Sequence, residues 1–113
     1  MEEVGQLSLD IFQTKDAIII LAPIAGTKSS DVTVTVTEDI LTIRGERLAP
    51  EFAEEKDYLT KECFWGKFSR SIVLPKNANP REIKASSKNN ILEIQIPKFT
   101  EEKTKIVKIN IDK

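Results

Sequence analysis

The side chains that most often perform catalysis are scarce in this sequence. It contains no histidine and a single cysteine, Cys63, so it can form no His-based catalytic triad, no His-ligated zinc site and no thiolate cage. Its four glycines are scattered, which excludes a phosphate-binding loop and a dinucleotide-binding fingerprint. The carboxylates lack the spacing of a calcium loop, and nothing singles out a catalytic pair. We therefore expect no enzyme, no metal and no cofactor.

One charged residue, Arg70, lies on a strand face that is otherwise apolar. In the stretch CFWGKFSRSIVLP (Cys63–Pro75), Phe68, Ile72 and Leu74 fall on one face of a strand at a period of two. Arg70 shares that face. A charge in an apolar face destabilises a fold unless it is paired. We expect Arg70 to meet a carboxylate at a sheet end or at a contact between subunits.

Short stretches of alternating or β-branched residues make up most of the chain, and no helix-length periodicity occurs. The expected strands are Leu7–Ile11, Ala17–Ala22, Asp31–Thr37, Leu41–Arg44, Tyr58–Trp65 leading into Gly66–Leu74, Ile83–Ser86 and Ile91–Pro97. Turn signals separate them at Glu38-Asp39, Asn79-Pro80 and Asn89-Asn90. In the first turn we expect Asp39 to be left-handed, and Cys63 to be a small packing residue. The pattern predicts an all-β fold, an immunoglobulin-like sandwich of antiparallel sheets.

Length and charge narrow the class of protein further. A chain of 113 residues is one domain, and 17 basic against 18 acidic side chains give no field that would attract nucleic acid or an anionic membrane. No apolar run approaches the roughly 20 residues of a membrane span, and residues 1–12 do not resemble a signal peptide. One cysteine cannot form an internal disulfide. We expect a cytoplasmic protein.

Three stretches together resemble the small heat-shock protein (Hsp20, alpha-crystallin domain) family, in its bacterial and plant-like branch. They are Gly-x-Phe-x-Arg-x-apolar-x-Leu-Pro at Gly66–Pro75, ILTIRGER at Ile40–Arg47, and Ala-x-x-x-Asn-Asn-Ile-Leu at Ala85–Leu92. The similarity runs from about Leu7 to Ile111. Asp39 and Asn90 stand where the family usually has glycine, and both residue types tolerate the left-handed region.

The resemblance implies an ATP-independent holdase chaperone, which binds partly unfolded proteins and limits their aggregation. It divides the chain into a short N-terminal remnant (residues 1–6), an alpha-crystallin domain (7–98) and a C-terminal extension (99–113). Members of the family usually carry a substantial apolar arm before the domain, whereas only Met1–Gln6 precedes it here. We therefore expect a dimer before any larger oligomer.

The acidic stretch Leu48–Asp57 interrupts the rhythm of the strands. It can be interpreted as a solvated loop, but Phe52 is the one aromatic residue in this acidic stretch, and we expect an apolar surface to cover it. The resemblance implies a dimerisation loop whose short strand pairs with the first strand of a second subunit. The dimer interface expected on this basis comprises Leu7, Leu9, Ile11, Phe52 and Arg70.

The segment Ile106–Ile111 follows a polar linker. It could add one more strand to the sheet, but Ile109-x-Ile111 resembles the C-terminal motif that inserts into a groove of a neighbouring subunit. Two side chains at i and i+2 of an extended chain point to one side, so both can enter one groove. That groove, which would also receive client segments, is expected to be lined by Val32, Val34, Val36, Ile83 and Ala85.

Two other classes of sandwich protein compete with this interpretation. An adaptor of the kind used by Hsp90 co-chaperones shares the fold but lacks the loop and the tail motif. A carbohydrate-binding or adhesion module would need exposed aromatic residues, and this chain has one Trp and one Tyr.

Overall fold

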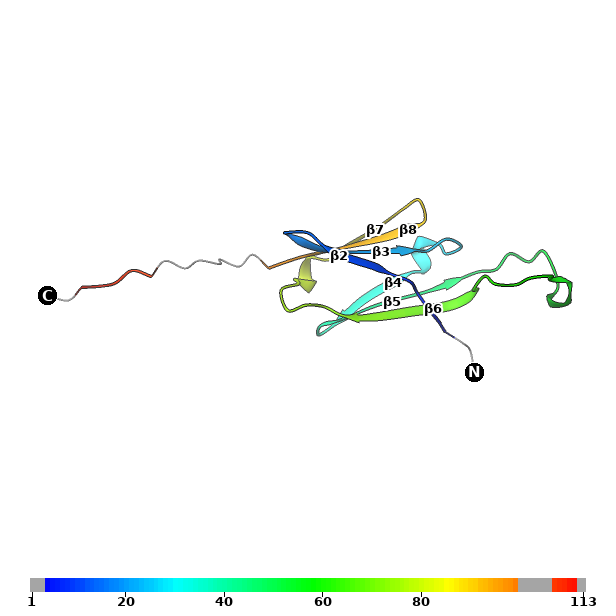
Figure 1. Ribbon diagram of the computed structural model, residues 1–113, viewed down its shortest axis with the longest axis horizontal. Coiled ribbons are helices and arrows are strands. Elements are labelled where there is room, and N and C mark those ends of the chain that lie inside the picture. The colour runs from blue at the N-terminus through cyan, green and yellow to red at the C-terminus, as the bar shows by residue number, and fades with distance from the viewer. Residues whose placement is uncertain (1–3, 100–106, 112–113) are drawn as a thin grey trace.

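The computed structural model describes residues 4–99 and 107–111, which form two stacked four-stranded sheets and a separate C-terminal segment (Figure 1). The strands are β1 (Gly5–Gln6), β2 (Asp10–Gln13), β3 (Ala17–Pro23), β4 (Thr33–Thr37), β5 (Ile40–Arg47), β6 (Gly66–Val73), β7 (Lys84–Lys88) and β8 (Ile91–Pro97). Their orders are β1-β6-β5-β4 and β2-β3-β8-β7. All pairs are antiparallel except β1 with β6. The prediction of an all-β sandwich is confirmed.

The described residues contain no α-helix. Three short 3₁₀ helices lie in the connections, at Ser29–Asp31, Glu55–Asp57 and Pro80–Glu82. In the third, the side chain of Asn79 accepts a hydrogen bond from the backbone N–H of Arg81, which caps the turn that Asn79-Pro80 predicts.

The core lies between the two sheets and follows from the alternation of the strands. Its largest fully buried side chains are Ile20, Ile24, Leu41, Ile43, Ile94 and Ile96. The pairs Ile18–Ile96 and Ile20–Ile94 lie opposite each other on β3 and β8, which puts β-branched side chains on one inner face. Each such burial contributes roughly 1.5–3 kcal/mol to folding before entropy is counted. The sandwich is therefore stabilised by the apolar side chains that alternate strand positions direct into the core.

The prediction of one strand over Leu7–Ile11 is wrong. The chain there passes from one sheet to the other, so that β1 joins β6 and β2 joins β3. Leu7 has its backbone N–H bonded to the carbonyl of Ser69 (3.3 Å) and its side chain is buried, whereas Ile11 is 48% exposed. Three extended residues span about 10 Å, the distance between two packed sheets. Residues 7–9 are used for this crossing and belong to no strand.

The predictions for Tyr58–Trp65 and Cys63 are also wrong. Residues 58–65 form no strand, because β5 ends at Arg47, opposite Gly66, and leaves nothing for them to pair with. Strand β6 begins only at Gly66, whose φ of +113° suits glycine. Cys63 is exposed on this connection instead of packed in the core. Residues 48–65 together form one long loop, which projects from one end of the sandwich (Figure 1).

The two hairpin turns differ in which residue is left-handed. Asn89 and Asn90 have φ values of 54° and 63°, the pattern of a two-residue hairpin turn that asparagine tolerates, as the sequence predicts. In the other turn Glu38 has a φ of 58°, so the assignment of the left-handed conformation to Asp39 is wrong. The carbonyl of Asp39 instead accepts a hydrogen bond from Leu74 (2.7 Å), which fixes its backbone against the end of β6.

Replacing Glu38 by asparagine is expected to stabilise the domain by about 1 kcal/mol, because asparagine occupies the left-handed region at lower cost. Asp39→Asn removes the same charge from the same turn, and should leave the free energy of unfolding within about 0.5 kcal/mol of wild type. Unfolding in urea measures both. Equal effects of the two substitutions would contradict the turn geometry described above.

Candidate protein-interaction site

The outer edge of β2 is open. The N–H of Thr14 donates to the carbonyl of Ala17 (2.8 Å). This hydrogen bond shows which residues of β2 direct their backbone groups toward β3 and which direct them away from it. In an antiparallel pair, successive residues point their backbone groups alternately toward and away from the partner strand. The backbone groups of Phe12 therefore face β3, and those of Ile11 and Gln13 face outward. Strand β2 is last in its sheet, so these outward groups can accept another strand.

An apolar hollow lies beside this edge. Strand β1 pairs only with Phe68 and Ser69, which leaves the rest of the β6 edge uncovered. The hollow between β2 and β6, which we call the β2–β6 groove, has a volume of about 280 Å³. Its lining consists of Ile11, Phe12, Gln13, Ile18, Ile72, Val73, Leu74 and Pro75. Phe12 and Val73 are 49% and 70% exposed, so the groove offers apolar surface next to unpaired backbone.

A second hollow lies on the opposite side of the sandwich, where β4 and β7 are the edge strands. This β4–β7 groove has a volume of about 340 Å³. Its lining consists of Ile24, Ser29, Val32, Val34, Ala85, Ser86, Ser87 and Leu92. Three of the five residues predicted to form a groove, Val32, Val34 and Ala85, thus lie together in one. The other two, Val36 and Ile83, are half-buried against the core and are not among its lining residues.

The loop of residues 48–65 exposes apolar side chains to solvent. Phe52 is 91% exposed and Leu59 is fully exposed. Leu59 is not among the residues predicted to form the interface, although an apolar side chain in a largely polar stretch is the same signal that identifies Phe52. The polar residues of the loop pair with one another: Lys61 Nζ lies 2.6 Å from a Glu55 carboxylate oxygen and 4.9 Å from the centre of the Tyr58 ring. The hydrogen bond to Glu55 raises the pKa of Lys61.

Arg70 does not meet a carboxylate within the described part of the chain. Its Nη1 donates a hydrogen bond to the backbone carbonyl of Leu7 (3.1 Å), a group that the crossing between the sheets leaves free of the β ladders. Leu7 itself is 4% exposed and belongs to the core of its own chain. Leu9 is half-buried in the same crossing, so neither leucine has an exposed side chain, and their assignment to a dimer interface stays a prediction. Of the predicted interface set, Ile11 and Phe52 are the exposed members.

The C-terminal segment is exposed and belongs to neither sheet. Ile109 and Ile111 are 86% and 81% exposed, and residues 107–111 form no strand. They lie beyond the end of the sandwich opposite to the loop (Figure 1). The alternative of one more strand in the sheet therefore does not hold for the described residues of this segment. Ile106 and the linker before it from residue 100 lie outside the described residues.

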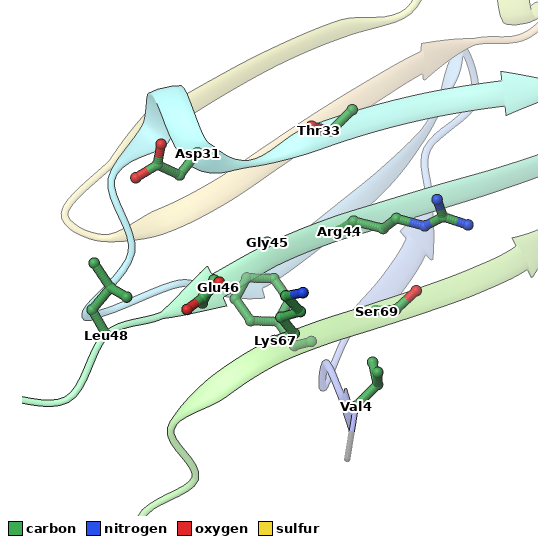
Figure 2. Close-up of a pocket in the computed structure, with 10 residues that line it drawn as sticks. Val4, Asp31, Thr33, Arg44, Gly45, Glu46, Leu48, Lys67 and Ser69 are labelled. Carbon is green, nitrogen blue, oxygen red and sulfur yellow. The ribbon is translucent and has the colours of Figure 1, made fainter. Parts of the chain in front are cut away.

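A further hollow, of about 700 Å³, is open to solvent, and its lining combines charged side chains with the apolar Val4 and Leu48. It lies on the outer face of β4, β5 and β6 (Figure 2) and is lined in part by Arg44, Lys67, Asp31 and Glu46, so that both charge signs meet there. The described residues contain no group of three or more His, Cys, Asp or Glu side chains that could hold a metal ion. They also include no helix long and apolar enough to cross a membrane. The apolar grooves and the open edge are the features that favour a partner.

The sequence matches the Hsp20/alpha crystallin family over residues 10–112. It is 33% identical over 100 residues to small heat shock protein C2 of Rickettsia felis, a match that covers 88% of this chain and 65% of that protein. The chain thus spans less than two thirds of the length of this relative. It is 34% identical over 104 residues to a 17.4 kDa class I heat shock protein of Arabidopsis thaliana, which covers 91% of this chain and 67% of that one.

Solved structures of similar proteins share the fold. A small heat-shock protein from Xylella fastidiosa, described as having a distinct high order structure, aligns with a TM-score of 0.78 at 26% identity. The match covers 93% of this chain and 96% of that chain. The hspA protein of Xanthomonas axonopodis aligns with the same TM-score at 31% identity and covers 85% of this chain and 96% of that one.

Proposed function

This chain belongs to the Hsp20/alpha-crystallin family of small heat shock proteins, and we propose that it is an ATP-independent holdase that binds partly unfolded proteins and limits their aggregation. The observation that carries the proposal is the pair of apolar grooves beside open strand edges. An unfolded segment exposes apolar side chains and unpaired backbone together, and such a groove satisfies both. Binding of this kind requires only an exposed apolar groove and an open strand edge, and it requires no ATP.

We propose that the working unit is a dimer formed by exchange of the loop. The loop of one subunit would add its backbone to the Ile11 and Gln13 edge of the partner and place Phe52 or Leu59 in the β2–β6 groove. Each buried side chain contributes roughly 1.5–3 kcal/mol. A two-fold dimer makes the contact twice, whereas the entropic cost of association is met once. Arg70 supports this interface only indirectly, by holding the crossing that leads into β2.

We propose that the exposed C-terminal pair binds in the β4–β7 groove. Burying Ile109 and Ile111 contributes roughly 3–6 kcal/mol, which leaves a free tail with about millimolar affinity once ordering costs are subtracted. Several tails in one assembly act at high effective concentration and can hold dimers together. Weak individual contacts let a tail leave its groove, and the vacated groove then becomes available to a client.

Holdase activity is expected in the absence of ATP. The chain should suppress the light scattering of a model substrate that aggregates when its disulfides are reduced. Ala85→Glu places a carboxylate in the β4–β7 groove and should raise the amount of protein needed for half-suppression several-fold, since a charge there disfavours apolar segments. Thr35→Glu adds the same carboxylate at an exposed position on β4 outside the groove, and this variant should behave as wild type. Absence of suppression at equimolar wild-type protein, or equal effects of the two variants, would contradict the proposal.

The mass in solution separates the roles of the loop and the tail. Light scattering is expected to give a dimer for a chain that ends at Glu102. The intact chain is expected to give the same dimer or a larger species that truncation reduces to it. The larger species would identify the tail as the link between dimers. A monomer at both lengths would rule out exchange of the loop and favour an adaptor function.

A further inference from the structure

The loop of residues 48–65 is fixed to the sandwich where it begins. Arg47, the last residue of β5, donates from Nε to the carbonyl of Ala25 (2.7 Å) and from Nη2 to the carbonyl of Pro23 (3.3 Å). Its guanidinium also lies over the ring of Phe68, 5.7 Å from the ring centre. The N–H of Leu48 donates to the carbonyl of Gly26 (3.2 Å). These contacts tie the start of the loop to the connection that follows β3.

The end of the loop is fixed at the same place. A Cβ built on Gly26 would lie 2.9 Å from Cγ of Arg47 and 3.3 Å from Cζ3 of Trp65, so the arginine stem and the indole ring both rest against this glycine. Gly26 has a φ of +83°, which a residue with a side chain rarely adopts. The two ends of the loop therefore converge on one backbone position that requires glycine.

Strand β1 belongs to the same support. A Cβ on Gly5 would lie 2.5 Å from Cε1 of Phe64, so the ring of the residue next to Trp65 lies against the backbone of β1. Arg70 in turn holds the residue that follows β1 through the carbonyl of Leu7. The base of the loop thus contacts three parts of the sandwich: β1, β6 and the β3–β4 connection.

We propose that Arg47 is the positioning residue for subunit exchange: by clamping the base of the loop, it sets the direction in which the loop leaves the sandwich. This inference rests on the loop exchange proposed above. A long loop that is free at its base samples many directions, and all but a few are lost when it pairs with a partner. A loop directed away from its own sandwich has lost much of that freedom already, so more of the contact energy appears as affinity.

The chemistry of arginine suits this role. Its planar fork donates to two carbonyls at once and stacks on a ring with its face, whereas a lysine ammonium is a point charge that does neither as well. Arg47→Lys should therefore restore only part of what Arg47→Ala removes, even though it keeps the positive charge.

The dissociation constant of the dimer tests the role in exchange. Arg47→Ala is expected to weaken the dimer about tenfold, because it removes two hydrogen bonds from a charged donor. Arg47→Lys should weaken it by a smaller but measurable factor. Arg44→Ala, three residues earlier on β5 and exposed on its outer face, removes the same charge and should leave the constant unchanged. Sedimentation over a range of concentrations gives all four values.

A probe on Cys63 tests the clamp independently of assembly. Cys63 is the one cysteine of the sequence, it is exposed, and it precedes Phe64 and Trp65, so a spin label there reports motion at the loop base. The label should become more mobile in Arg47→Ala and Arg47→Lys but not in Arg44→Ala, while the far-ultraviolet circular dichroism stays that of wild type.

The outcomes separate this inference from the function it rests on. A wild-type dimer whose dissociation constant is the same in Arg47→Ala, Arg47→Lys and Arg44→Ala overturns the role of Arg47 and leaves loop exchange intact. Unchanged label mobility in both Arg47 variants overturns the clamp itself. A wild-type chain that stays monomeric at every concentration overturns loop exchange, and the role of Arg47 in it.

Discussion

The outer backbone edge of β2 is left unpaired, and the surrounding elements are arranged around this open edge. A strand edge beside apolar surface attracts other chains, and folded proteins usually blunt it with lysine, proline or a covering segment. Strand β7, the other edge of the same sheet, has a lysine at each end, whereas β2 reads Asp-Ile-Phe-Gln and has none. Its outward groups at Ile11 and Gln13 are left available for a second chain.

The remaining features follow from keeping that edge open in a stable domain. The crossing at residues 7–9 brings the chain from the β6 edge to the β2 edge, and Leu7 fixes it by entering the core. Because β1 is only two residues long, most of the β6 edge stays uncovered, and the β2–β6 groove opens there. Core residues that border the grooves, among them Ile18 and Leu92, are already buried within the single chain, at 4% and 6% exposure. The domain can therefore be stable while both of its long sides stay available.

Local patterns in the sequence predict the parts of the fold that local physics determines. The alternation in β8 identifies a buried strand because the side-chain period of a strand is two. The run Ala17–Ala22 identifies another because it is apolar, too short for a helix and rich in β-branched residues. The pair Asn89-Asn90 identifies its turn because asparagine tolerates a positive φ. Three residues of the β4–β7 groove, Val32, Val34 and Ala85, follow from the same alternation, combined with the motifs of the family.

The sequence-based predictions are wrong or incomplete where residues far away in the sequence determine the local structure. Leu7–Ile11 alternates like a strand, but the sheet crossing, set by pairing with β6 and β3, divides it between two sheets. Tyr58–Trp65 has the composition of a strand, but no strand among the described residues pairs with it. Within the single chain Arg70 bonds a carbonyl of the N-terminal crossing, 63 positions away in sequence, and its predicted contact with a carboxylate of another subunit stays a prediction. The Arg47 clamp is likewise invisible in the sequence, because its acceptors are backbone carbonyls of another connection.

Amide hydrogen exchange can show whether a second copy of the chain covers the β2 edge, as we propose. The amides of Ile11 and Gln13 are expected to exchange slowly at concentrations where the dimer forms and quickly on dilution, because a partner strand would accept their hydrogen bonds. The amide of Phe12, which faces β3, should be protected at both concentrations. Exchange at Ile11 and Gln13 that is fast and independent of concentration, in a sample shown to be dimeric, would contradict the account and place the dimer contact elsewhere.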